Sequence, residues 1–108
     1  MAGTFTIKAL GDGTLPIAKS TLYTVPVSTN TIVKTITYVN TGGSPVTVNL
    51  YINSAGTSRR IVPKNLSLKA GSSMETDEEY TLEAGDLIEG DASTALVIDY
   101  TIHGVEES

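Results

Sequence analysis

The sequence predicts an all-β fold, a single antiparallel β-sandwich of about eight strands. Three observations predict it. Thr, Val and Ile are abundant, short β-rich runs alternate with Gly, Pro, Asn and Ser turns, and no segment has the spacing of an amphipathic helix. With about eight strands a jelly roll is the leading arrangement, and an immunoglobulin-like sandwich is the alternative. The length of 108 residues fits one domain over residues 1–108.

The central stretch Thr31–Ser54 predicts two long strands, Thr31–Thr41 and Pro45–Ser54, joined as a hairpin through Gly42–Ser44. The second strand alternates cleanly, so alternate residues are expected in the core. These are Val46, Val48, Leu50 and Ile52. Residues of the opposite face, such as Asn49, are expected toward water or a neighbouring subunit. In the first strand the same period puts Ile32, Lys34, Ile36 and Tyr38 on one face and Val33 and Val39 on the other.

Before this stretch, Phe5–Ala9 alternates as a first strand, and Gly11–Gly13 is predicted to end it in a turn. Ser20–Val27 is predicted as the second strand. Pro26 cannot donate to a ladder, so that strand is expected to end there or to lie at a sheet edge.

After the stretch, Arg59–Val62 is a short predicted strand that Pro63 ends, and Leu66 and Leu68 alternate with a polar residue. The two similar runs that end at Gly71 and Gly85 predict repeated turn chemistry rather than a repeat architecture.

The last predicted strand, Ala95–Val105, also alternates. Its core-facing residues are expected to be Leu96, Ile98, Tyr100 and Ile102. Glu106–Ser108 is expected to be a solvated tail.

The charges are divided along the chain. Residues up to Lys69 hold all seven bases and one acid, a net charge of +6, whereas the rest holds eleven acids and no base, −11. Either the two halves neutralise each other inside one subunit, or opposite poles of neighbouring copies meet. The overall charge of −5 and the lack of a basic stripe with aromatics disfavour nucleic acid binding.

No catalytic constellation stands out. His103 is the single histidine, no nucleophile-elbow motif is present, and the acidic run after Ala70 does not match a calcium loop. Cysteine is absent, so neither a disulfide nor a zinc site is expected. We therefore expect no enzyme and no cofactor or metal. No apolar run is long enough for a membrane span and no export signal is recognisable at the start, so a soluble protein without membrane contact is expected.

Several strand and turn segments resemble small all-β virion proteins of tailed bacteriophages and prophages. The segments are Leu22–Pro26, Val33–Ile36, Val39–Gly43, Val46–Tyr51, Leu82–Asp86 and Ile88–Ala92. The resemblance implies a structural component of the particle, located in the virion after assembly in the host cytoplasm. It includes no active-site motif, so it implies no functional residues.

Two roles follow from this resemblance. The first is a capsid decoration, or cement, protein that binds the major capsid protein lattice and other virion proteins and stabilises the head. The alternative is a tail- or fibre-associated module that recognises a receptor.

Self-association is also expected. Val33, Val39, Val97 and Val105 would have to be covered, and a closed ring of identical chains does this without open-ended growth. A trimer would suit the local three-fold positions of an icosahedral shell. The residues expected to make the contacts are the bases Arg59, Arg60 and Lys64 and the acids Glu75, Asp77, Glu78 and Glu79.

Overall fold

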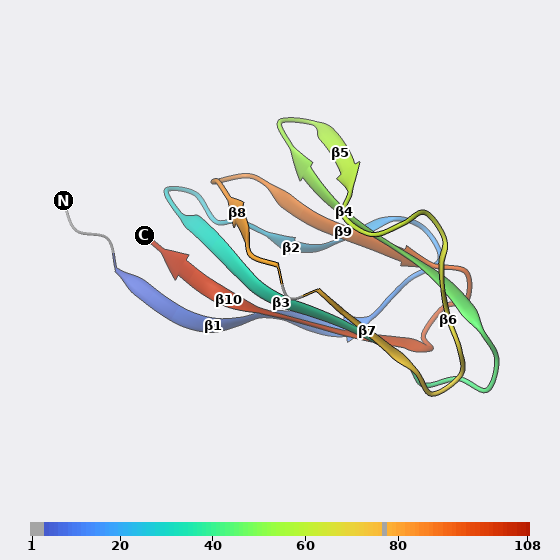
Figure 1. Cartoon of the computed structure of the whole chain (residues 1–108). Helices are drawn as coiled ribbons and strands as arrows, with labels where there is room; N and C mark the ends of the chain where they lie inside the picture. Colours follow the sequence, from blue (N-terminus) through green and yellow to red (C-terminus); the bar gives the residue numbers. More distant parts are fainter. Residues whose placement is uncertain (1–3, 77) are drawn as a thin grey trace.

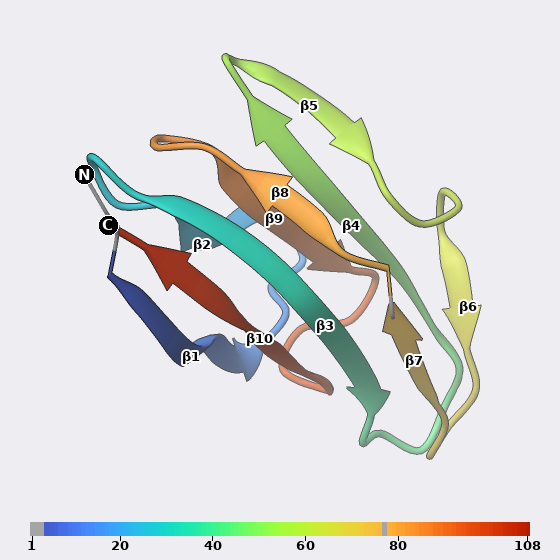
Figure 2. The ribbon, with the colours of Figure 1, turned by 60° about the vertical axis from the view of Figure 1, so that its left-hand side comes forward.

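The computed structural model describes residues 4–76 and 78–108. These residues form two antiparallel β-sheets that face each other, without a helix (Figures 1 and 2). The predicted all-β sandwich is therefore confirmed. No helix in this described part is long and apolar enough to cross a membrane.

Each sheet contains five strands. Sheet A contains β1 (Phe5–Thr14), β10 (Ile98–Glu107), β3 (Asn30–Asn40), β7 (Ser73–Thr76) and β8 (Tyr80–Leu82). Sheet B contains β2 (Ser20–Thr24), β9 (Leu87–Ala92), β4 (Val46–Ser54), β5 (Thr57–Arg60) and β6 (Leu66–Leu68).

The strands pair in a nested order. β1 pairs with β10, β2 with β9, β3 with β7 and β8, and β4 with β6, so the chain rolls up with its first strand beside its last. This is the connectivity of a jelly roll, as predicted, and not that of an immunoglobulin-like sandwich. β7 and β8 pair with successive parts of β3 and together occupy one strand position, while β5 forms an added hairpin with β4.

The predicted hairpin between β3 and β4 is wrong, because the two strands belong to different sheets. The segment between them crosses the sandwich at one end. Asn40 is fully buried there, and its amide donates to the carbonyl oxygens of Ser44 (2.9 Å) and Leu68 (3.0 Å). Its side-chain oxygen accepts from the Gly42 N–H (2.9 Å). These bonds tie the end of β3 in sheet A to the crossing loop and to β6 of sheet B. Turn residues alone do not distinguish such a crossing from a hairpin.

A β-bulge at Lys34 changes which residues of β3 face the core. Thr35 lies opposite His103 and Val33 opposite Gly104, so Lys34 is the extra residue. Val33 is consequently fully buried, on the same side as Ile36 and Tyr38. The prediction that Val33 lies on the face opposite Ile36 and Tyr38 is wrong. It assumed uninterrupted alternation, and a bulge shifts the alternation by one residue.

Three further expectations at the strand ends are wrong. Gly11–Gly13 is not a turn but continues β1 beyond a second bulge at Leu10. Glu106 and Glu107 are not a free tail, because they pair with β1 and β3. Leu96 is not in the core but lies in the turn before β10, 74% exposed and with a positive φ of 65°.

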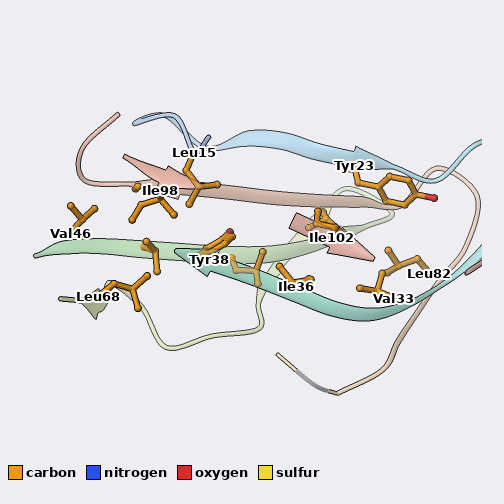
Figure 3. Packing of buried hydrophobic residues seen from close by; sticks show 14 of the residues in the cluster. Leu15, Tyr23, Val33, Ile36, Tyr38, Val46, Leu68, Leu82, Ile98 and Ile102 are labelled. Atoms are coloured by element: carbon orange, nitrogen blue, oxygen red, sulfur yellow. The ribbon is translucent and has the colours of Figure 1, made fainter. Parts of the chain in front are cut away.

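One cluster of buried side chains fills the space between the sheets (Figure 3). The predicted core residues Val46, Val48, Leu50, Ile98 and Ile102 belong to it, and Ile52 and Tyr100 pack against it half-buried. Tyr38, at its centre, donates its hydroxyl to the Asn49 carbonyl oxygen (3.1 Å).

Candidate interaction surfaces

The outer face of sheet B contains a buried polar network centred on Asn49. Its amide donates to Asp91 Oδ1 (2.8 Å) and to Asn65 Oδ1 (3.1 Å). Its side-chain oxygen accepts from the Asn65 main-chain N–H (2.9 Å) and from Arg60. Asn49 lies opposite Asp91 in the β4–β9 ladder and is 6% exposed. This Asn49 network thus ties β4, β9, β5 and the segment before β6 into one rigid face.

Tyr51 lies beside this network with its ring flanked by two cations. The Lys19 ammonium is 4.7 Å from the ring centroid and the Arg60 guanidinium 4.9 Å, both within cation–π range. The Tyr51 hydroxyl donates to Asp91 Oδ2 (2.9 Å). Burial, together with this bond to a carboxylate, raises the pKa of Tyr51. Two cations of the same subunit therefore already contact the ring.

Glu89 extends the polar face toward β2. It is 9% exposed and accepts a hydrogen bond from the Ser58 hydroxyl (3.0 Å), while Lys19 donates to the same hydroxyl (3.3 Å). The residues of β4 that were expected to face water or a neighbour are thus partly covered by their own chain.

The bases predicted to touch a partner divide into two kinds. Arg60 is held by Asn49 and the Tyr51 ring, so its charge is engaged within the subunit. Arg59, the residue before Arg60 in β5, and Lys64, in the loop before β6, are exposed. We call Arg59 and Lys64 the basic surface.

The predicted acids lie along the β7–β8 edge of sheet A. Glu75 is exposed on β7, and Glu78 and Glu79 are exposed just before β8. Glu79 forms an ion pair with Lys34 of the bulge (2.5 Å). Asp77 lies outside the described residues. We call Glu75, Glu78 and Glu79 the acidic surface.

Within the described part of the chain, no hydrogen bond or ion pair joins the basic surface to the acidic surface. Two other bases do pair with acids from the second half of the chain, Lys34 with Glu79 and Lys8 with Glu106. The charge division is therefore partly satisfied inside the subunit, and within the described residues Arg59 and Lys64 on one side and Glu75 and Glu78 on the other form no ion pair.

A further polar cluster lies between the sheets near the chain ends. The Tyr23 hydroxyl donates to Glu106 Oε2 (2.6 Å) and lies 2.8 Å from the Thr31 hydroxyl, and Lys8 donates to Glu106 Oε1 (3.2 Å). The bond from Tyr23, followed by that from Lys8, lowers the pKa of Glu106 despite partial burial. Burial and the Glu106 carboxylate raise the pKa of Tyr23 to about 12.

The histidine lies apart from these clusters. His103 is exposed on the outer face of sheet A, beside a shallow hollow of about 390 Å³ that Ile7, Ala9 and Val105 also line. In residues 4–76 and 78–108, no group of three or more His, Cys, Asp or Glu side chains is arranged to hold a metal ion.

The sequence does not reveal the Asn49 network, because Asn49 and Asp91 are forty-two positions apart and only the β4–β9 register makes them neighbours. The available signal is weak: a polar residue in the middle of each of two apolar strands.

Comparisons with known proteins identify the fold and no family. No protein-family model matches the chain, and no curated protein matches it. Among solved structures, a chain of the T13 IBDV viral particle, described as a missing link in the evolution of icosahedral viruses, matches 99% of this chain with 9% identity and a TM-score of 0.56. This chain spans 31% of that one. The shared feature is the sandwich fold.

A second solved structure has a weaker likeness. It belongs to the Bacillus endospore appendages, a family of disulfide-linked pili, and matches 97% of this chain and 87% of its own with 17% identity and a TM-score of 0.43.

Proposed function

We propose that this protein is a non-enzymatic structural component of a bacteriophage particle, a decoration protein that binds the major capsid protein lattice and stabilises the head. The observation that carries the proposal is the jelly-roll likeness, over 99% of the chain, to a chain of an icosahedral viral particle. Jelly rolls also occur in lectins and in cupin enzymes, so the fold alone does not distinguish a virion protein from these classes.

Those surfaces favour a contact role. The Asn49 network bonds β4, β9, β5 and the segment before β6 together, and exposed Arg59 and Lys64 belong to β5 and to the loop before β6. The acidic surface lies along an edge of sheet A. Complementary charge fixes the orientation of a subunit more than it adds affinity, which suits a protein seated at repeated positions of a lattice.

In this proposal Arg59 and Lys64 contact acidic groups of a capsid protein or of a neighbouring copy, and Glu75, Glu78 and Glu79 contact basic ones. Arg60 supports them through its internal bonds. Asp77 belongs to the same acidic stretch in the sequence. The trimer at local three-fold positions stays a prediction, and the virion, assembled in the host cytoplasm, is the proposed location.

The test is the copy number and position of the protein in purified phage particles. Quantitative mass spectrometry should find hundreds of copies per particle, and labelling should place them on the head. The charge-reversal variant Arg59→Glu/Lys64→Glu should lower occupancy most at low salt, because exposed charges are screened beyond about 8 Å at physiological ionic strength. The matched control is Lys69→Glu, since Lys69 is an exposed base outside the basic surface. Equal occupancy of both variants and the natural protein would refute the role of the basic surface.

A second candidate function is a tail- or fibre-associated receptor-binding module, favoured by one loop. Leu96 is 74% exposed in the left-handed region, where a leucine is strained, and Ile17 of the adjoining loop is 64% exposed. The Leu96 N–H donates to the Leu15 carbonyl oxygen (3.3 Å), which joins the two loops at one end of the sandwich. A few copies at the tail tip, instead of hundreds on the head, would support this module.

A further inference from the structure

The free edge of β1 differs from every other sheet edge in the described residues. β1 has 10 residues, whereas the opposite edge of sheet A is divided between β7 and β8, of 4 and 3 residues. Sheet B ends in β2, of 5 residues, and in β5 and β6, of 4 and 3. Short edges resist pairing with other chains, and a long edge invites it.

The main chain of β1 has hydrogen-bonding groups that point away from its own sheet. Thr4 and Ser108 exchange both of their main-chain bonds (2.7 and 3.0 Å), and the β1–β10 register continues from this pair. Because such pairs alternate along an antiparallel ladder, Thr6 and Lys8 bond toward β10. The N–H and C=O groups of Phe5, Ile7 and Ala9 therefore point outward.

The same three residues carry apolar side chains on the outer face of sheet A. Phe5 is 66% exposed and Ile7 90% exposed. Ile7 lies opposite Val105, which lies opposite Ile32, so an apolar row crosses the sheet and ends at the free edge. Beyond Ala9 the bulge at Leu10 changes the strand, and near Gly11 the chain approaches β2, so the free part is Phe5–Ala9.

We propose that this edge pairs antiparallel with the same edge of a second copy of this chain, about a two-fold axis at Ile7. The register places Ile7 opposite Ile7 and Phe5 opposite Ala9 of the other copy, with all outward groups bonded. The two copies then form one continuous sheet.

The hollow beside Ala9 supports this register over its neighbours. The hollow is lined by Ile7, Ala9, His103 and Val105, and Ala9 is the small residue at its edge. Phe5 of the second copy, opposite Ala9, is placed to fill it. Moving the axis to Lys8 would put the two Lys8 ammonium groups opposite each other, and like charges in that position destabilise a sheet. With the axis at Ile7, Lys8 lies opposite Thr6 of the other copy, whose neighbour across the β1–β10 ladder is Glu106.

The absence of cysteine makes the register measurable by cross-linking. In Ile7→Cys the two sulfurs meet at the axis, where paired Cα atoms are about 5.5 Å apart, within disulfide range. Oxidation should convert most of Ile7→Cys to a covalent dimer. Thr6→Cys and Val27→Cys should stay near background, because the first projects to the other face of β1 and the second is exposed elsewhere. Stronger cross-linking of Thr6→Cys than of Ile7→Cys would overturn the register.

Sedimentation velocity tests the pairing without a covalent link. The natural chain should reach twice the monomer mass as its concentration rises to about a millimolar, a range that covers weak contacts. Ile7→Pro removes only an outward N–H and should leave one chain at the same concentrations with an unchanged circular dichroism spectrum. Phe5→Ala should weaken dimerisation while keeping the main-chain bonds. A natural chain that stays monomeric would overturn the proposal. A trimer mass would also overturn it and would favour the predicted three-fold contact instead. These measurements use purified protein alone, so their failure is distinguishable from failure of the capsid role.

Discussion

Asn49 lies where four polar contacts meet, and its replacement gives the sharpest test of the energetics. Asn49→Ala removes donation to Asp91 and Asn65 and acceptance from Arg60 and the Asn65 N–H. Two of these bonds involve charged partners, for which a net contribution of about 1.5 to 3 kcal/mol is typical, against about 1 for neutral ones. Water can reach Arg60 and Asn65, which are exposed, so the sum is discounted. We expect a loss of about 3 kcal/mol in the free energy of unfolding.

Urea unfolding followed by far-ultraviolet circular dichroism measures this loss. With a slope of about 1.5 kcal/mol per molar, the midpoint should fall by about 2 M. The matched control is Asn53→Ala, the same residue type on the same face of β4 and half-buried. It should change the midpoint by less than about 0.5 M, as expected away from such networks. Equal effects of the two replacements would refute the view that the Asn49 network stabilises sheet B.

Exchanging Asn49 and Asp91 tests whether the stability of this pair depends on its charges or on its packing. Asn49→Asp alone places a second carboxylate against Asp91, in place of a donor 2.8 Å from its oxygen, and should destabilise more than Asn49→Ala. Adding Asp91→Asn restores one donor and one carboxylate to the pair and should recover at least half of that loss. If the double variant is no more stable than Asn49→Asp, the loss does not come from repulsion between the two carboxylates.

Three other predictions concern the core and the polar cluster near the chain ends. Gly104→Ala would place a methyl 2.2 Å from a main-chain carbonyl oxygen of β3, so thermal unfolding should show a loss of at least about 2 kcal/mol. Gly43→Ala is the control: no atom lies within 4 Å of the added methyl, so the free energy of unfolding should hardly change. Equal losses in the two variants would contradict the close packing at Gly104. The lowered pKa of Glu106 stabilises the fold above about pH 4.5, and this stability is lost as the pH falls. The raised pKa of Tyr23 stabilises it below pH 10, and that contribution is lost between pH 10 and about 12. In Tyr23→Phe the free energy of unfolding should fall less steeply at both acidic and alkaline pH. An unchanged pH dependence would show that the Tyr23–Glu106 pair does not cause it. Val48→Asp should abolish the folded circular dichroism spectrum, because an unpaired charge in the core costs several kcal/mol, comparable with the total stability of a domain. A variant that still unfolds cooperatively on heating would contradict this prediction.

The sequence alone determined the fold class and most of the core. Alternation is a local property, so Val46, Val48 and Leu50 could be placed inside, and the turns at Gly71 and Gly85 appear with the positive φ that favours glycine. The number of strands favoured a jelly roll but left an immunoglobulin-like sandwich open, and it did not predict the divided β7–β8 position or the β5 hairpin.

Only the tertiary structure decided how the strands combine. A Gly turn serves a hairpin and a crossing equally well, and the bonds of Asn40 to the crossing loop and to β6 of sheet B hold the crossing between β3 and β4. Bulges at Leu10 and Lys34 shift the alternation, and nothing in a period of two predicts where a residue will be left unpaired. The Asn49 network and the outward groups of β1 depend on the register between strands that are distant in the sequence, so only the folded chain makes them visible.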